Sequence, residues 1–343
     1  MSIVLTEQQK EKIRIARDKR IWSDIHGNIF AEMEDCKYLS KCGGEPACML
    51  CRGDTGAGKS AVIAKFRDDH KRYEKLDASV IPVVYTVLPT KVSERGLLTS
   101  ILKSIGPEIV DFKDFDDEED LLREIVRLVD RLGIELFIID EAQGFLEHDS
   151  RRLVYDATEC VKNLIIRTNR PFILFGMPWC LHAVEQNSQL AGRFLRRRYL
   201  APFRITQDQD RGAYIGFLDM LDEEFAKDLG FTEKAGLGSK DIALRLFAVS
   251  RGNLRVLRSV IDQAVVNAVR GNASKMEYDH FCQACDIFFP ESNPFKIKSL
   301  DMIKYVELAK PSYWDKDAKR GQSPVVDQTY TQELKLSEAL SAT

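Results

Sequence analysis

Residues 53–60 read Gly-Asp-Thr-Gly-Ala-Gly-Lys-Ser and fit the pattern G-x-x-x-x-G-K-[ST] at every position. An apolar stretch precedes them and a helix-like stretch, residues 61–75, follows. In this context the pattern forms a phosphate-binding loop, where backbone N–H groups and a helix N-terminus face the phosphates. We expect ATP to bind here, with Lys59 at the β- and γ-phosphates and Ser60 on Mg²⁺. The predicted nucleotide-binding residues of this motif are Gly53, Asp54, Thr55, Gly56, Ala57, Gly58, Lys59, Ser60 and Ala61.

A second motif lies further along the chain, where residues 136–141 read Leu-Phe-Ile-Ile-Asp-Glu. Four apolar residues predict a buried strand, and two carboxylates follow at its C-terminal end, where open α/β sheets bind ligands. Asp140 is expected to hold Mg²⁺ and Glu141 to orient and polarise the attacking water. With Lys59, these are the predicted catalytic residues of the site. A further strand, residues 79–88, separates the two motifs, so their strands need not be adjacent in the sheet.

The rest of the chain predicts an α/β fold followed by helices. Short strands that are apolar on both faces alternate with helices, which is typical of a parallel sheet covered by helices. The predicted strands are residues 47–52, 79–88, 135–140, 171–176 and 198–203. After residue 205 only helices are predicted. The predicted organisation is an N-terminal helical segment (1–45), a core with a five-stranded parallel sheet (46–204), a small α-helical lid domain (205–290) and a flexible C-terminal tail (291–343) that is a candidate for partner binding.

Four arginines stand close together just before the predicted fifth strand, at Arg193, Arg196, Arg197 and Arg198. One interpretation is a solvated basic face, which is common. The other is an arginine finger that reaches the γ-phosphate bound by a neighbouring subunit and stabilises charge during phosphoryl transfer. Their position favours the finger, and the sequence does not decide which of these arginines serves.

Another arginine, Arg255, stands one turn into a helix that follows Gly252 and Asn253. From there its side chain could lean over the nucleotide from the lid, which adds it to the predicted nucleotide-binding residues. The alternative is a surface arginine that follows a capping residue.

Composition sets limits on function. The chain has 343 residues, 44% of them hydrophobic, and a formal net charge of −3. No apolar run is long enough to span a membrane, and the N-terminus is charged without a signal-peptide core, so a cytoplasmic location is expected. The net charge gives no general sign of nucleic-acid binding, so any DNA contact needs a local patch.

Four cysteines lie close together, at Cys36, Cys42, Cys48 and Cys51. One interpretation is a zinc site. The other is a set of buried thiols, which is more typical of a strand residue such as Cys51.

Together the two motifs, the arginine cluster and Arg255 resemble those of AAA+ ATPases, over about residues 45–289. Within that class, GDTGAGKS, LFIIDEAQ, GRFLRRRYLAPF and GNLR look like the TnsC/TniB transposition regulators. The resemblance implies an ATPase that forms a homo-oligomer, a ring or a helical filament, on double-stranded DNA. It also implies contacts with transposase subunits and with a TniQ/TnsD-like target selector, and no role for a membrane.

Two further expectations follow from the resemblance. In this family the DNA-facing segment lies after the second strand, where Thr90, Lys91, Arg95 and Lys103 stand, although ordinary solvated side chains would look the same. AAA+ proteins also usually carry a polar residue at the end of the fourth strand, where this chain has Met177. We therefore expect slow hydrolysis, used as an assembly switch.

Three other functions fit parts of the pattern. A small-molecule kinase would leave the arginine cluster and Arg255 without a role. A STAND-like signalling ATPase shares the motifs but usually carries long repeat or effector regions. A helicase loader of the IstB type would bind a replicative helicase.

Overall fold

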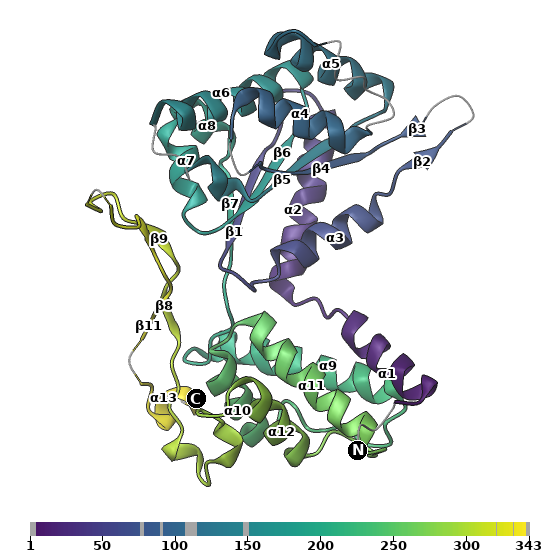
Figure 1. The fold of residues 1–343 in the computed structure, drawn as a ribbon, viewed down its shortest axis with the longest axis vertical. Coiled ribbons are helices and arrows are strands. Elements are labelled where there is room, and N and C mark those ends of the chain that lie inside the picture. The colour runs from purple at the N-terminus through teal and green to yellow at the C-terminus, as the bar shows by residue number, and fades with distance from the viewer. Residues whose placement is uncertain are drawn as a thin grey trace. The chain divides into compact units, whose positions relative to one another are not determined.

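The computed structural model describes residues 5–75, 79–89, 92–106, 115–146, 151–319, 321–331 and 333–340. The chain divides into two compact units (Figure 1). The first, called here the sheet unit, comprises His26–Leu200 and Pro311–Asp327. The second, the helical unit, comprises Met1–Ile25, Ala201–Lys310 and Gln328–Thr343. None of the helices in the described ranges is long and apolar enough to cross a membrane.

The sheet unit is built on a five-stranded sheet in the order β4-β5-β6-β1-β7. Every neighbouring pair in it is parallel, and all residues of β5 and β6 are buried, which explains why these strands are apolar on both faces. The predicted fold class is thereby confirmed. The motif strands β1 and β5 are separated by β6, whereas the strand that lies between them in the sequence, β4, is at the edge. The strands are β1 (Met49–Gly53), β4 (Val83–Val87), β5 (Leu136–Asp140), β6 (Phe172–Gly176) and β7 (Arg196–Leu200).

Helices cover both faces of this sheet (Figure 1). On one face α4, α5 and α6 pack against one another, and α2 and α3 lie on the other (Figure 1). Asp117 caps the N-terminus of α5, because its carboxylate accepts the Asp120 N–H at 2.9 Å. The helices are α2 (Asp24–Lys41), α3 (Lys59–Asp69), α4 (Glu94–Ile105), α5 (Glu118–Arg131), α6 (Arg151–Thr168), α7 (Cys180–Gln186) and α8 (Ser188–Arg193), with a 3₁₀ turn, η2 (Ala142–Phe145), and a hairpin of β2 (Tyr73–Glu74) and β3 (Ser79–Val80).

The helical unit has a core formed by amphipathic helices. In α11 one apolar face is buried at Leu257, Ile261, Ala264 and Ala268, and Asn253 caps this helix by accepting the Arg255 and Val256 N–H groups. The elements are α1 (Glu7–Asp18), α9 (Asp208–Leu229), α10 (Lys240–Ser250), α11 (Leu254–Arg270), α12 (Tyr278–Phe288), α13 (Leu336–Leu340), η3 (Pro294–Lys296), η4 (Leu300–Met302), β8 (Leu308–Lys310) and β11 (Thr329–Tyr330).

The units differ from the sequence-based division at both ends of the chain. At the N-terminal end, α1 packs on α11 of the helical unit, while most of α2 belongs to the sheet unit. At the C-terminal end, the described part of residues 291–343 contains buried side chains rather than only exposed ones. Phe295 and Tyr305 join the core of the helical unit, and β9 (Tyr313–Trp314) pairs with β10 (Val325–Val326) in the sheet unit.

Candidate nucleotide-binding site

The loop between β1 and α3 has the backbone that a phosphate-binding loop requires. Gly56 and Gly58 have φ values of 82° and 101°, which side chains other than glycine rarely adopt. Gly53 also lies in a tight place, because a Cβ there would lie 3.0 Å from the Leu200 carbonyl oxygen and would require the backbone to shift. Helix α3 begins after Gly58 without a side-chain cap. The N–H groups of its first turn are therefore suited to an anion.

Lys59 points back into this loop. Its Nζ donates to the carbonyl oxygens of Gly53 at 2.5 Å and Asp54 at 3.2 Å, and lies 3.7 Å from the Met177 sulfur. Burial lowers the pKa of Lys59, and the nearby Asp140 and Glu141 carboxylates oppose that shift. An ammonium in such a place is stabilised by a further anion, and the phosphates of a nucleotide would supply it.

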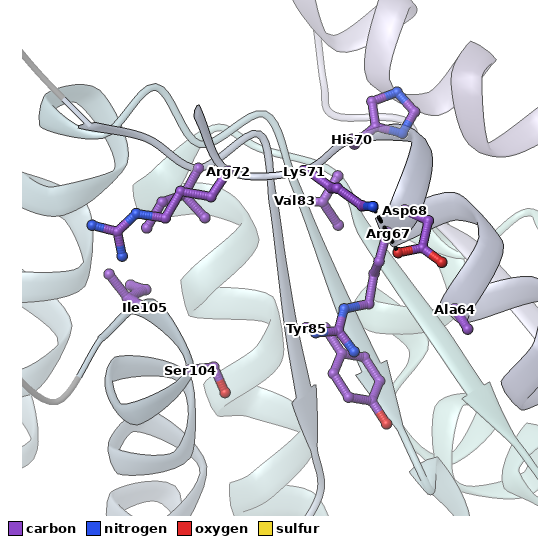
Figure 2. Close-up of a pocket in the computed structure, with 11 residues that line it drawn as sticks. Ala64, Arg67, Asp68, His70, Lys71, Arg72, Val83, Tyr85, Ser104 and Ile105 are labelled. Atoms are coloured by element: carbon purple, nitrogen blue, oxygen red, sulfur yellow. Dashed lines mark ion pairs between the residues drawn. The ribbon is translucent and has the colours of Figure 1, made fainter. Parts of the chain in front are cut away.

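At the end of β5, Asp140 is 5% exposed, and burial raises its pKa. One carboxylate oxygen accepts the Glu141 N–H at 2.8 Å, and the other lies 3.4 Å from the Tyr85 hydroxyl. Tyr85 stands on β4, and its ring lies under the Arg67 guanidinium (Figure 2). The desolvated carboxylate of Asp140 is a suitable oxygen ligand for Mg²⁺, whose charge would favour the ionised form.

Glu141 has an unusual backbone conformation, and its side chain contacts a residue that the sequence did not single out. Its φ is 60°, in the left-handed region. Gln143 donates from its amide nitrogen to the Glu141 carboxylate, and its amide oxygen accepts the Met177 N–H at 3.0 Å. Gln143 thus supplies a polar group beside Met177, where the fourth strand, β6, ends without one. Its place in the LFIIDEAQ segment was visible in the sequence, but its partner on β6 was not.

The Asp54 side chain faces the protein. Its carboxylate accepts the Tyr199 hydroxyl at 2.8 Å and the Ser312 N–H at 3.2 Å, and it is 2% exposed. Within the sheet unit, Asp54 therefore fixes the loop to β7 and to the segment Pro311–Asp327. Only the backbone of Asp54 remains for phosphates. Neither contact could be predicted, because Tyr199 and Ser312 lie far from the loop in sequence.

The residues of the site fit Mg²⁺ and ATP. The Lys59 ammonium and the uncapped first turn of α3 are suited to phosphates, while the Ser60 hydroxyl and the Asp140 carboxylate are hard oxygen ligands. Among the described residues there is no cluster of three or more His, Cys, Asp or Glu that could hold a metal. Cys36, Cys48 and Cys51 are buried free thiols, and burial raises the pKa of Cys36 to about 11.

Two of the clustered arginines face α2. Arg196 and Arg198 stand two positions apart on β7 and so project from the same face of the sheet. Arg196 lies 3.8 Å from Asp35, and Arg198 lies 2.6 Å from Glu32. These pairs hold α2 against the edge strand of the sheet.

The other two arginines of the cluster have different partners. Arg197 pairs with Glu185 of α7 at 2.9 Å and donates to the Phe194 carbonyl oxygen. Arg193, at the end of α8, is 17% exposed and lies 3.5 Å from Glu45. All four arginines thus have acidic partners within the same unit.

The contacts described so far do not include the remaining predicted residues. Arg255 is exposed on α11 of the helical unit. Arg95 donates to the carbonyl oxygens of Phe115 and Asp116 and thereby supports the start of α5, while Lys103 is exposed near the end of α4. Thr90 and Lys91 lie outside the described residues.

The family model described as "Bacterial TniB protein" matches residues 13–203, more than half of the chain. The chain belongs to the TniB family. The match spans the phosphate-binding loop, the acidic end of β5 and the arginine cluster. Together with the parallel sheet and its loop, membership of this family identifies a transposition-associated AAA+ ATPase. A comparison with curated protein sequences found no match.

Three solved structures are distantly similar to this TniB protein. The Orc1 protein of Aeropyrum pernix in complex with DNA is 16% identical, with a TM-score of 0.47, and 83% of this chain covers 66% of that one. Cdc6p of Pyrobaculum aerophilum is 12% identical, with a TM-score of 0.49, and the match covers 84% of this chain and 69% of that one. A Walker-type ATPase of Pyrococcus abyssi is 15% identical, with a TM-score of 0.49, and the match covers 75% of this chain and 71% of that one.

Proposed function

We propose that this TniB protein assembles on double-stranded DNA when ATP is bound, and that the assembly links a target-selection protein to the transposase subunits. The observation that carries the proposal is the TniB match over residues 13–203, a range that contains the phosphate-binding loop and the acidic end of β5. Family membership supports the transposition role, and the site supports control by ATP.

The site residues have complementary roles in the proposed reaction. Lys59 and the first turn of α3 hold the phosphates, and Ser60 and Asp140 hold Mg²⁺. Bound Mg²⁺–ATP supplies the phosphoryl group that is transferred to water. Glu141 accepts a proton from that water, and Gln143 keeps the Glu141 carboxylate in position. Met177 offers no polar side chain at the γ-phosphate, so we expect turnover well below tens per second in the absence of a partner.

The proposed assembly also assigns roles to three groups outside the loop. One arginine of the cluster reaches the nucleotide of a neighbouring subunit, and Arg255 approaches the nucleotide bound by its own chain. DNA contacts come from Arg95, Lys103, Thr90 and Lys91, and their binding to phosphates weakens as salt rises. The segment after residue 291 is proposed to contact partner proteins.

Electron microscopy and sedimentation test this proposal. The protein is examined with and without duplex DNA, each with ATP, ADP or a non-hydrolysable analogue, beside a Lys59→Ala variant. We expect rings or filaments only with DNA and a triphosphate, and none from the variant.

Other outcomes would favour other functions. Assembly that needs ATP but ignores DNA would indicate a STAND-like ATPase. A monomer under every condition would refute the proposed function and leave a small-molecule phosphotransferase as the better hypothesis. Binding to a replicative helicase in place of transposase would indicate a loader of the IstB type.

A further inference from the structure

A pocket of about 380 Å³ opens in the sheet unit beside the edge strand β4, away from the phosphate-binding loop. It lies between the C-terminal ends of α3 and α4 (Figure 2). Three basic side chains line it, from Arg67, Lys71 and Arg72, against the single carboxylate of Asp68. A pocket that gathers like charges with one counter-charge has a positive potential and attracts an anion.

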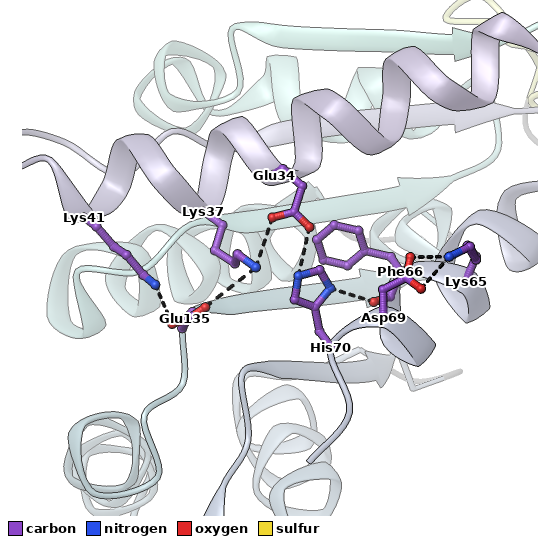
Figure 3. Close-up of polar contacts among 8 residues, drawn as sticks. All are labelled: Glu34, Lys37, Lys41, Lys65, Phe66, Asp69, His70 and Glu135. Atoms are coloured by element: carbon purple, nitrogen blue, oxygen red, sulfur yellow. Dashed lines mark hydrogen bonds and ion pairs between the residues drawn. The ribbon is translucent and has the colours of Figure 1, made fainter. Parts of the chain in front are cut away.

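The neighbouring carboxylates are engaged elsewhere. Asp69 pairs with Lys65, and Glu34 pairs with the ring of His70 at 2.8 Å, while Glu135 pairs with Lys37 and Lys41 (Figure 3). The second ring nitrogen of His70 lies 2.8 Å from the Phe66 carbonyl oxygen. This network fixes the C-terminal end of α3 and leaves Asp68 as the only carboxylate among the residues that line the pocket.

Within the pocket the charges are only partly neutralised. Lys71 lies 3.6 Å from Asp68, a long contact between two exposed side chains. Arg72 donates to the Ser79 hydroxyl at 2.7 Å and lies 3.6 Å from Glu74. Among the residues that the structure describes, Arg67 has no carboxylate partner.

Arg67 is nevertheless held in place. Its guanidinium lies 4.4 Å from the centre of the Tyr85 ring, within the range of a cation–π interaction. The Tyr85 hydroxyl lies 3.4 Å from the Asp140 carboxylate at its other end. A guanidinium stacked on a fixed ring keeps its N–H groups free for an anion, and its planar fork matches two oxygens of a phosphate.

The exposure of the basic groups favours a polymer over a small phosphate compound as the ligand. The side chains of Lys71 and Arg72 are 72% and 42% exposed, so a ligand too large to enter the pocket can still reach them. Arg72 leads directly into the β2–β3 hairpin, where Lys75 lies over the exposed ring of Tyr73. A further basic side chain, that of Lys75, therefore stands beside the pocket on the same hairpin as Glu74.

We infer that Arg67, Lys71 and Arg72 form a binding site for the phosphodiester backbone of double-stranded DNA. This inference rests on the proposed function, in which DNA supports assembly, and it assigns the contact to the end of α3 in addition to the residues after β4. Contacts to phosphates position a protein on DNA without reading its sequence, so the site binds duplexes of any sequence.

Fluorescence anisotropy with a labelled duplex tests the inference, in a non-hydrolysable ATP analogue and over a series of salt concentrations. The double variant Arg67→Gln/Lys71→Gln is compared with Lys234→Gln/Lys10→Gln, which removes the same charge from two exposed lysines outside the pocket. We expect the first to bind about tenfold more weakly and to lose roughly two units of the salt slope, because each phosphate contact contributes about one. The control is expected to bind as the wild type does.

Three results would overturn the inference, and they are distinguishable. If the wild type binds duplex and Arg67→Gln/Lys71→Gln binds equally well with the same slope, the site is wrong and the proposed function stands. If the wild type binds no duplex under any condition, the proposed function fails and the site with it. If inorganic pyrophosphate raises the thermal stability of the wild type and not of the variant, while both bind duplex alike, the pocket takes a free phosphate compound instead.

Discussion

Gln143 connects the ends of two neighbouring strands at the nucleotide site. Its amide oxygen accepts the Met177 N–H after β6, and its amide nitrogen donates to Glu141 after β5. The left-handed backbone of Glu141 costs on the order of 1–2 kcal/mol in a residue other than glycine, so nearby contacts must maintain it. Gln143 acts through Glu141 and is a positioning residue.

Replacing Gln143 with Ala is expected to lower kcat for ATP hydrolysis on the order of tenfold and to leave KM for ATP within about twofold. The reason is that Glu141 loses its support while Lys59 keeps its contacts with the loop. Steady-state hydrolysis assays measure both constants. The control is Gln189→Ala, which changes an exposed glutamine of the same unit. An unchanged kcat in Gln143→Ala would show that the Gln143 amide does not position Glu141 for hydrolysis.

Asp262 gives the helical unit a pH-dependent stability. It lies 2.9 Å from Arg258 in α11, and burial raises its pKa to about 6 despite that pair. Folding raises the pKa of Asp262, so the folded state binds the proton more tightly than the unfolded chain does. The stability that depends on this proton is fully present below the pKa of the unfolded chain, near 4, and is lost as pH rises through about 6. Between pH 5 and pH 7 the wild type should therefore lose about 1 kcal/mol of unfolding free energy that Asp262→Asn does not lose. Chemical denaturation at several pH values measures this, with Glu291→Gln as an exposed control, and parallel pH profiles for the wild type and Asp262→Asn would contradict it.

Gly252 shows how an element boundary depends on a contact distant in sequence. Its φ is 78°, and a Cβ there would lie 2.0 Å from the Phe203 carbonyl oxygen. The Phe203 N–H donates to the Gly252 carbonyl oxygen at 2.9 Å, so the segment entering the helical unit runs against the turn before α11.

The change Gly252→Ala should destabilise the helical unit by about 3 kcal/mol, because the new methyl group would overlap backbone and not a movable side chain. Gly216→Ala is the matched control. Gly216 lies inside α9 with nothing within 4 Å of a Cβ, so alanine there should stabilise by about 0.5–1 kcal/mol. Urea denaturation of the two variants should give shifts of opposite sign, and a neutral Gly252→Ala would mean that the two segments separate at little cost.

The elements themselves were largely predictable, because local signals set them. The loop of residues 53–60, the buried strand before Asp140 and the apolar face of α11 each depend on neighbouring residues in the chain. The contacts of Gln143 with Met177, and of Asp54 with Tyr199, depend on the order of strands in the sheet. No local pattern specifies that order, so these partners could be found only in three dimensions.

The ends of the chain were predicted less well for the same reason. Residues 291–343 appear polar and irregular, but scattered aromatic residues such as Phe295 and Tyr305 are buried by helices formed earlier in the chain. Arg245 adds to this by donating to the carbonyl oxygens of Pro294 and Ile297. A segment with no periodic apolar face of its own can still be ordered by a core that already exists.

At the scale of the whole molecule, the proposed assembly gives the arginine cluster a role that connects control by ATP to the contact between subunits. Arg196 and Arg198 pair with α2, and Arg193 and Arg197 pair with Glu45 and Glu185. A finger must exchange such a partner for the phosphate of a neighbouring subunit. The pairs with exposed carboxylates are worth no more than about 1 kcal/mol each, so this exchange costs little.

Mixed oligomers identify the finger. A subunit with Glu141→Gln cannot hydrolyse ATP but keeps its arginines, and a subunit in which one arginine of the cluster is changed to Ala keeps an intact site. If that arginine acts on a neighbour, each variant alone should hydrolyse ATP on the order of 10³-fold more slowly than the wild type. Mixing them should restore part of the activity, since the intact site then faces an intact arginine. The four arginines are tested one at a time, and Arg170→Ala, an arginine of the same unit that pairs with Asp130, serves as the control. If an arginine only holds α2 in place, changing it to Ala should lower the stability of the protein, and mixing should restore no activity. If none of the four variants complements, the cluster has a structural role only, and other residues complete the nucleotide sites in the assembly.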